Sequence, residues 1–327
     1  MIDNIDAMHP QYQKTIAAVK LVRDSTDGEV SIKSLENQKV YLPDDCDNNN
    51  PDKSAMYNMR VKKAEYDAVP SNTLGSLLGA INRQPHDFSG IPTSLSYMLD
   101  DIDGDGMTAQ EMTSLMVSEL LQMRYCGLLA EYSDLASAGF ESNHLTREQA
   151  KKANLRASVK FYSRESIINW DFKTINGSKQ LNFVVLKETE SVPVNGTLLT
   201  EMVDSYLLLA LDENGKYYQM RYVEEINGVG GWSEKVYPSK VSGLFDYIPF
   251  NFCIMGEYQK GKLPIDCGYL YTICTKTLHR YQTSADYKMA MWYSASPITY
   301  STNWDSHAVG VYKELTGNDY IKSGPGD

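Results

Sequence analysis

The fold class of this chain is decided by residues 205–224, which read SYLLLALDENGKYYQMRYVE. Two β-rich runs in this stretch flank Asn214-Gly215, a dipeptide that is a strong short-range signal for a β-hairpin turn. Asn176-Gly177 separates Ile167–Phe172 from Gln180–Glu188 in the same way. The two hairpins predict antiparallel strands in the middle of the chain.

Further β-rich runs lie on both sides of these hairpins. Ser158–Tyr162 precedes them, and Trp232–Tyr237 and Tyr247–Met255 follow them as an expected strand pair. Five or more antiparallel strands make a sheet that is large enough to form a layer of its own.

Amphipathic helices are expected before and after the strands. The first ends near Gly28, and later ones begin at signals for a helix N-terminus, namely Pro51, Ser71, Pro92 and Thr108. Their apolar residues recur at helical spacing, as in Leu74, Leu77, Leu78 and Ile81, or in Met112, Leu115 and Met116. Each such face needs a partner to cover it.

The order of these segments predicts an α+β protein. A long helix is expected over Pro264–Trp292, because no proline interrupts the pattern before Pro297. We expect three parts: helical residues 1–135, β-rich residues 136–262, and residues 263–327 with the long helix.

Composition and charge exclude some classes of protein. The chain has 327 residues, and 31 Lys and Arg against 42 Asp and Glu give a net charge of −11. A protein that holds nucleic acid by net positive charge is excluded, although a protein that lets DNA pass is not. The acidic N-terminus does not resemble a signal peptide, and the apolar runs are too short to span a membrane, so no membrane partner is expected.

The acidic loop Asp101-Ile102-Asp103-Gly104-Asp105-Gly106 begins like a calcium-binding EF-hand loop. That loop requires oxygen ligands at its first, third and fifth positions and a bidentate glutamate at its twelfth. Counted from Asp101, the twelfth residue is Met112, and Glu111 falls one residue short. Thr108–Glu111 instead matches a capping box that begins a helix. A calcium-binding module at Asp101–Asp105 remains an alternative.

Residues 256–263, which read GEYQKGKL, nearly match a phosphate-binding P-loop. The motif requires Ser or Thr after its lysine, because that hydroxyl holds magnesium, and Leu263 occupies this position. Asp212, at the end of the apolar run Leu207–Leu211, would be the acidic partner of Lys262. A divergent nucleotide-binding hydrolase that uses Lys262 and Asp212 is the second alternative to a solvated loop and a hairpin.

Other residues that could carry chemistry form no recognisable site. The histidines (His9, His86, His144, His279 and His307) lack metal-ligand spacing, and the cysteines (Cys46, Cys126, Cys253, Cys267 and Cys274) contain no CxxC pair. Two small basic groups, Arg60, Lys62 and Lys63 and then Lys151, Lys152 and Arg156, are interpreted as solvated helix faces. We therefore predict no catalytic residue, cofactor or metal ion, and no enzymatic activity.

A series of short blocks runs in order from His9 to Pro297. The most specific block is Ser166-Ile167-Ile168-Asn169-Trp170. The others are His9–Tyr12, Val22–Asp24, Tyr41–Pro43, Tyr57–Arg60, Asn72–Gly79 with Pro85, Asp100–Gly106, Asn176-Gly177, Leu181–Glu188, Ile248–Phe250 and Arg280–Tyr287. In their order and spacing these blocks resemble a family of tailed-bacteriophage proteins that look like portal proteins, the head-to-tail connectors.

The resemblance implies a structural subunit without an active site. Portal subunits form a ring, expected here to be a dodecamer, at one vertex of the capsid. Double-stranded DNA passes through the ring during packaging and ejection without sequence-specific binding. The implied partners are copies of the same chain, the terminase, a head–tail adaptor and the major capsid protein. The implied location is the virion, with assembly in the host cytoplasm.

The resemblance also suggests what each part of the chain would do. Residues 1–135 would be the helical part of a portal wing, and residues 136–262 its β-rich part. Residues 263–327 would begin the stem and clip, and because family members continue further, we expect a subunit truncated after Asp327. The net charge of −11 fits a tunnel lining that repels DNA phosphates.

Overall fold

The computed structural model describes residues 7–43, 51–132, 156–175, 177–193, 200–226, 229–240, 243–256 and 261–295. The chain divides into two compact units. Unit 1 comprises Met1–Arg23 and Asn72–Thr272, and unit 2 comprises Asp24–Ser71 and Ile273–Asp327. The divisions fall within three helices, α1 (Pro10–Asp27), α5 (Val69–Ile81) and α8 (Tyr271–Ala295).

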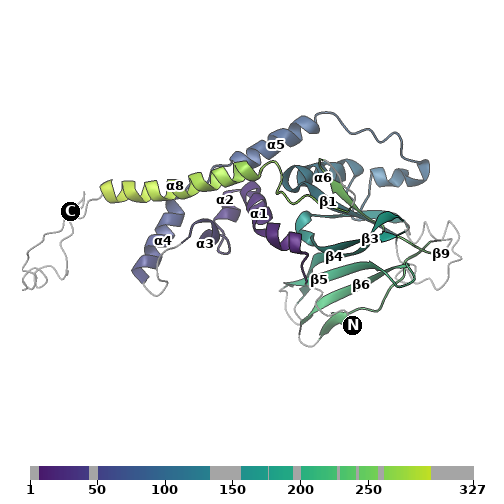
Figure 1. Cartoon of the computed structure of the whole chain (residues 1–327). Helices are drawn as coiled ribbons and strands as arrows, with labels where there is room; N and C mark the ends of the chain where they lie inside the picture. The colour runs from purple at the N-terminus through teal and green to yellow at the C-terminus, as the bar shows by residue number, and fades with distance from the viewer. Residues whose placement is uncertain are drawn as a thin grey trace, which may run out of the picture. The chain divides into compact units, whose positions relative to one another are not determined.

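The larger sheet of unit 1 is a five-stranded antiparallel meander (Figure 1). Both predicted hairpins are confirmed, because Ile175 pairs with Ser178 and Leu211 pairs with Tyr217. Gly215 has φ of +71°, a conformation that glycine adopts without strain. The strands are β3 (Ile167–Ile175), β4 (Ser178–Pro193), β5 (Thr200–Leu211), β6 (Tyr217–Ile226) and β7 (Val229–Trp232).

The second sheet of unit 1 has the strand order β10-β1-β2. Its strands are β1 (Tyr125–Tyr132), β2 (Ala157–Tyr162) and β10 (Phe250–Ile254), and a short pair joins β8 (Ser239–Lys240) to β9 (Gly243–Leu244). The predicted strand pair of Trp232–Tyr237 with Tyr247–Met255 is wrong, because β7 pairs with β6 and β10 pairs with β1. This pairing joins segments that lie far apart in sequence, and no turn signal encodes it.

Side chains from both sheets form one hydrophobic core. Trp170 of β3 makes edge-to-face ring contacts with Tyr125 of β1 and Phe252 of β10. At Gly127 of β1, a Cβ atom would lie 2.2 Å from Cζ of Phe250 in the neighbouring strand β10 and 3.1 Å from Cδ1 of Ile167 in the larger sheet. The core therefore holds β1 and β10 against the larger sheet.

Helical segments of unit 1 precede β1. Helix α6 (Ala109–Met123) lies on β1 (Figure 1). The helix predicted to begin at Pro92 is a 3₁₀ helix, η1 (Thr93–Leu99), and Pro92 is its N-cap residue. Another 3₁₀ turn, η2 (Arg164–Ser166), leads into β3.

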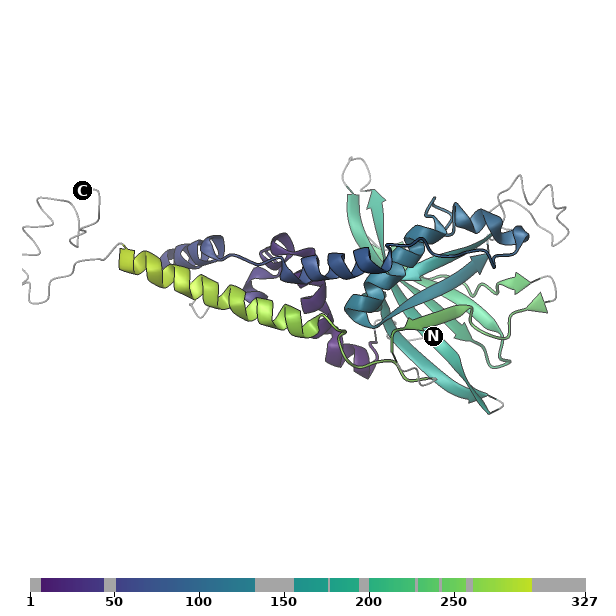
Figure 2. The ribbon, with the colours of Figure 1, turned by 90° about the horizontal axis from the view of Figure 1, so that it is seen from above.

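Unit 2 is helical in its described residues. It contains α2 (Glu29–Ile32), α3 (Gln38–Tyr41), α4 (Pro51–Lys63) and most of α8. Helix α8 lies beside α4 (Figure 2), and Asp286 of α8 accepts a hydrogen bond from Nη2 of Arg60 at 2.7 Å. The ring of Tyr281 packs edge-to-face against Tyr66 at 5.9 Å.

The α+β class is confirmed, with N-terminal helices, antiparallel strands and a long helix near the C-terminus. The long helix begins later than predicted, at Tyr271 instead of Pro264. Gly268, three residues before the helix, has φ of +84°, and a Cβ atom there would lie 2.2 Å from the carbonyl oxygen of Gln122. The segment before Tyr271 therefore follows the surface of α6 as a loop.

Candidate functional site

The acidic loop Asp101–Gly106 is shaped by hydrogen bonds to its own carboxylates. Asp101 Oδ1 accepts hydrogen bonds from the amides of Gly104 and Gly106 at 2.8 and 3.2 Å. Its other oxygen, Oδ2, pairs with the guanidinium of Arg156, and this hydrogen bond lowers the pKa of Asp101. Arg156 thus supplies a positive charge at a carboxylate oxygen that a cation would otherwise contact.

The capping box after this loop is confirmed. Thr108 Oγ1 accepts a hydrogen bond from the amide of Glu111 at 3.2 Å, and Glu111 Oε2 accepts one from the amide of Thr108 at 2.8 Å. The amide of Thr108, together with its hydroxyl group, which donates to Glu111 Oε2 at 2.8 Å, lowers the pKa of Glu111. Met112, the twelfth residue of the EF-hand pattern, is a buried residue of α6. The geometry favours a loop that begins a helix, and a calcium-binding module at Asp101–Asp105 stays a hypothesis.

The P-loop-like stretch falls partly on residues 257–260, which lie outside the described residues. Lys262 is exposed. Asp212 sits in the β5–β6 turn, where its Oδ1 accepts hydrogen bonds from the amides of Asn214 and Lys216 at 2.9 and 2.7 Å. The carboxylate of Asp212 therefore shapes the hairpin, and the nucleotide-binding alternative stays a hypothesis.

Three of the predicted basic residues have aromatic or acidic neighbours. Arg60 pairs with Asp286 at 2.7 Å, Lys63 lies 4.4 Å from the ring centre of Trp292, and Arg156 pairs with Asp101. Lys62 is exposed, while Lys151 and Lys152 lie outside the described residues. The basic groups therefore contribute to contacts within their own unit.

A buried ionic cluster in unit 1 links α1, α6 and η2. Arg23 Nε and Nη2 donate to the two carboxylate oxygens of Glu165 at 2.9 and 2.8 Å. Nη2 also donates to Glu119 Oε2 at 2.7 Å, and Nη1 donates to Gln122 Oε1 at 3.3 Å. One guanidinium thus bridges two carboxylates on segments that lie far apart in sequence.

The pKa values of the two carboxyl groups in this cluster are shifted in opposite directions. Burial raises the pKa of Glu119, although the positive charge of Arg23 opposes that shift. Burial also acts to raise the pKa of Glu165, but the bidentate hydrogen bonds and charge of Arg23 outweigh it, so the pKa of Glu165 is lowered. Arg23 thus acts to lower the pKa of both carboxyl groups against the effect of burial.

Arg164 extends the contact towards the loop before α8. It is 2 % exposed, and its Nη1 donates to the carbonyl oxygens of Met123 and Asp266, each at 2.8 Å. Its guanidinium also lies 4.7 Å from the ring centre of Tyr125. None of the residues in this cluster was predicted as a site. Glu119, a charged residue within an apolar helix pattern, is the sequence signal that could have indicated it.

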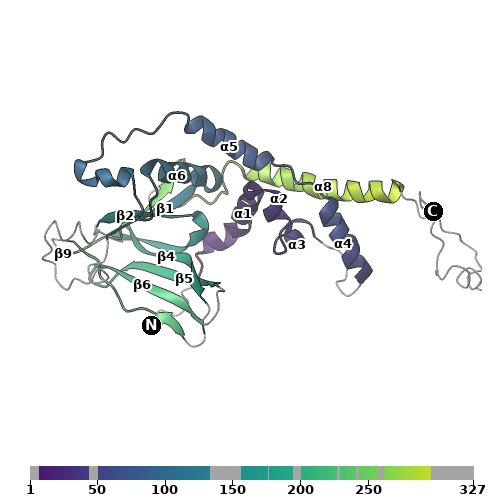
Figure 3. The same cartoon turned by 180° about the vertical axis from the view of Figure 1, so that it is seen from behind.

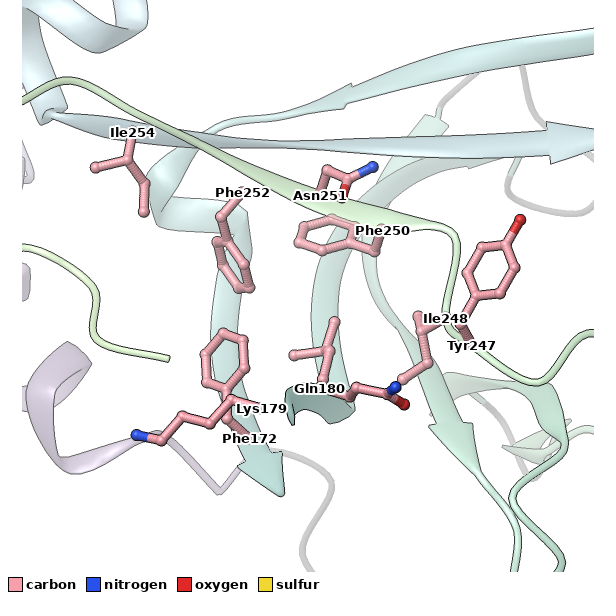
Figure 4. A pocket seen from close by; sticks show the side chains of 10 residues that line it. Phe172, Lys179, Gln180, Tyr247, Ile248, Phe250, Asn251, Phe252 and Ile254 are labelled. Carbon is pink, nitrogen blue, oxygen red and sulfur yellow. The ribbon is translucent and has the colours of Figure 1, made fainter. Parts of the chain in front are cut away.

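A cavity of about 590 Å³ opens between β10 and the β3–β4 hairpin. Figure 4 shows the rings of Phe172, Phe250 and Phe252 on its walls. Lys179 is the one charged side chain among the lining residues, which also include Gln180 and Asn251. The cavity is an opening at the edge of the hydrophobic core.

Helix α5, labelled in Figure 3, has an apolar sequence and few buried side chains. Residues 69–81 read VPSNTLGSLLGAI and contain no charged side chain, and Pro70 is the one buried residue of the helix. Leu77 is 39 % exposed and Ile81 is 43 % exposed. The predicted helix is thus confirmed, while its apolar face lacks the cover that such a face requires.

Within the described ranges, no three His, Cys, Asp or Glu side chains are grouped so that they could hold a metal ion. No helix in the same part of the chain is long and apolar enough to cross a membrane. No protein-family model matches the chain, and no curated protein matches it.

Proposed function

We propose that this chain is a structural subunit that assembles with copies of itself into a ring, the portal of a tailed bacteriophage. In this proposal the ring lies at one vertex of the capsid, binds the terminase and a head–tail adaptor, and lets double-stranded DNA pass. The order of sequence blocks from His9 to Pro297 supports the portal assignment.

The uncovered face of α5 is the observation that carries the assembly part of the proposal. A helix of 13 residues without charge is poorly suited to permanent contact with water, yet Val69, Leu77 and Ile81 are all exposed. A ring of identical subunits uses two different surfaces of each chain, and each surface is covered by the next copy. Such an interface would cover α5.

The first test is imaging of the purified protein by negative-stain electron microscopy, together with its mass in solution. We expect closed rings and a mass that is a multiple of the subunit mass of 36.8 kDa. A chain that remains monomeric at all accessible concentrations would contradict the assembly. ATP hydrolysis that is lost in Lys262→Ala would instead favour the nucleotide hydrolase.

A charge on α5 tests the proposed interface directly. Leu77→Asp places a carboxylate in the apolar face, and burial of that charge in an interface is unfavourable, so the variant should remain monomeric. Ser94→Asp adds the same charge at another exposed position and should still form rings. Equal assembly of both variants would show that α5 lies outside the interface.

A further inference from the structure

Two cysteines lie opposite each other in the smaller sheet of unit 1. Cys126 of β1 pairs with Cys253 of β10 in the antiparallel register. The neighbouring pair is joined by a hydrogen bond from the amide of Met255 to the carbonyl oxygen of Arg124 at 2.8 Å. Hydrogen-bonded pairs recur at every second residue, so the cysteines form one as well, with Cα atoms about 5.5 Å apart. That separation lies within the range of protein disulfides.

The two thiols are in contact but differ in their environments. Cys126 is 0 % exposed, whereas Cys253 is partly exposed. The hydrogen bond between the two side chains lowers the pKa of Cys253 to about 7, although burial opposes this shift. The same hydrogen bond, together with burial and the nearby charge of Glu119, raises the pKa of Cys126. The accessible sulfur is thus also the one that more readily becomes a thiolate.

We propose that Cys126 and Cys253 form a redox-active dithiol, which small disulfides such as oxidised glutathione convert into a reversible cross-strand disulfide. Cys253 is the attacking thiol because solvent reaches it. Cys126 is the resolving thiol because it is buried directly beside Cys253. The proposal rests on the fold of unit 1 alone, so its test does not depend on whether the chain forms a portal.

The exchange proceeds in two balanced steps. The thiolate of Cys253 attacks one sulfur of oxidised glutathione, the S–S bond breaks, and one glutathione thiolate leaves and takes up a proton. Cys126 then loses its proton and attacks the sulfur of Cys253, which expels the second glutathione. Two protein thiols are oxidised to one disulfide, and one glutathione disulfide is reduced to two thiols.

The product would fasten an edge of the sheet. β10 lies at the end of the order β10-β1-β2, and its pairing in this sheet is with β1. A disulfide between residues opposite each other would join the two strands covalently. Oxidation should therefore slow amide hydrogen exchange in β10 more than in β2, which lies on the other side of β1.

The test treats the full-length chain in its folded state with oxidised glutathione, blocks remaining thiols with iodoacetamide and maps tryptic peptides by mass spectrometry. Trypsin releases the two cysteines on separate peptides, Tyr125–Arg147 and Val241–Lys260, and releases Cys267 and Cys274 together on Leu263–Lys276. We expect the first two peptides to be joined, and dithiothreitol to separate them. If both peptides remain singly alkylated, or if either joins another cysteine, the proposal is overturned.

Two serine variants assign the roles of the thiols. In Cys126→Ser, the resolving thiol is missing, so Cys253 should retain one glutathione as a stable mixed disulfide. In Cys253→Ser, the buried Cys126 should remain unmodified over the same time. Modification of Cys126 in Cys253→Ser, or an unmodified Cys253 in Cys126→Ser, would overturn the assigned order of attack. The wild-type experiment requires neither variant, so a variant that fails to fold leaves the proposal testable.

Discussion

Replacement of Arg23 by methionine tests whether the ionic cluster of unit 1 holds its segments together. In the folded chain one guanidinium makes four hydrogen bonds to Glu165, Glu119 and Gln122. The side chain of Glu119 is only 4 % exposed, so water cannot replace the lost partner. Arg23→Met keeps much of the apolar volume of the side chain and removes its charge and donors.

The expected loss follows from the burial of Glu119. Removal of one partner from a buried ion pair costs about 3–5 kcal/mol, because the remaining charge is left without compensation. The side chains of Arg23 and Glu165 are 28 % and 27 % exposed, which places the expected loss near the lower end of that range. We therefore expect Arg23→Met to lower the free energy of unfolding by about 3 kcal/mol.

The control is an exposed pair in the same unit. Lys160 pairs with Glu131 at 2.8 Å, and its side chain is 43 % exposed, so Lys160→Met should cost at most about 1 kcal/mol. A second change, Glu119→Gln, removes the buried charge and should recover part of the loss caused by Arg23→Met.

Urea unfolding followed by tryptophan fluorescence measures these differences, provided that the slope against urea is equal among the variants. Equal losses in Arg23→Met and Lys160→Met would refute the reasoning, and so would a double variant that is no more stable than Arg23→Met alone.

Three further changes test other contacts, each by the same unfolding assay. Gly127→Ala should destabilise the fold by about 1–3 kcal/mol because the added Cβ would clash with the ring of Phe250, and a stabilising effect would contradict this packing. Gly75→Ala, where no atom lies within 4 Å of the added Cβ, should stabilise α5 by about 0.5–1 kcal/mol. Thr108→Ala removes the capping hydrogen bond and should cost about 1 kcal/mol, and an unchanged midpoint would contradict the cap. Because the pKa of Glu165 is lowered in the folded chain, this carboxylate stabilises the fold fully above its unfolded-state pKa, and the stabilisation is lost as the pH falls through the folded-state pKa. Glu165→Gln should therefore weaken the dependence of the unfolding free energy on pH at acidic pH.

Local features of the fold could be predicted because their causes lie within a few residues. Asn176-Gly177 and Asn214-Gly215 each allow a tight turn, and both hairpins form where they were expected. The Thr108–Glu111 capping box is likewise a matter of four consecutive residues. Such signals identify elements, but they carry no information on which distant segments meet.

The pairing of β10 with β1 and the Arg23 cluster could not be predicted, because local sequence signals do not indicate which distant segments meet. Each depends on contacts between residues that lie far apart in sequence, as with Arg23 and Glu165, which are 142 positions apart. No strand was expected before Ser158, yet β1 forms at the centre of the smaller sheet. The sequence pattern predicts the apolar faces of α5 and α6, but Leu77 and Leu115 on these faces are exposed in the structure. Periodicity indicates that a helix face is apolar, and it carries no information on which segment packs against that face.

The nested connectivity of unit 2 affects how the chain is made on the ribosome. Its first segment, Asp24–Ser71, is separated from its second, which begins at Ile273, by about 200 residues of unit 1. At a synthesis rate of about 5–20 residues per second, roughly 10–40 s pass before α8 emerges. During that interval Tyr66 lacks the ring of Tyr281 against which it packs in the finished unit. The nascent chain therefore exposes an incomplete helical unit, which is a natural substrate for a holding chaperone. Unit 1, by contrast, can complete both of its sheets before α8 is synthesised.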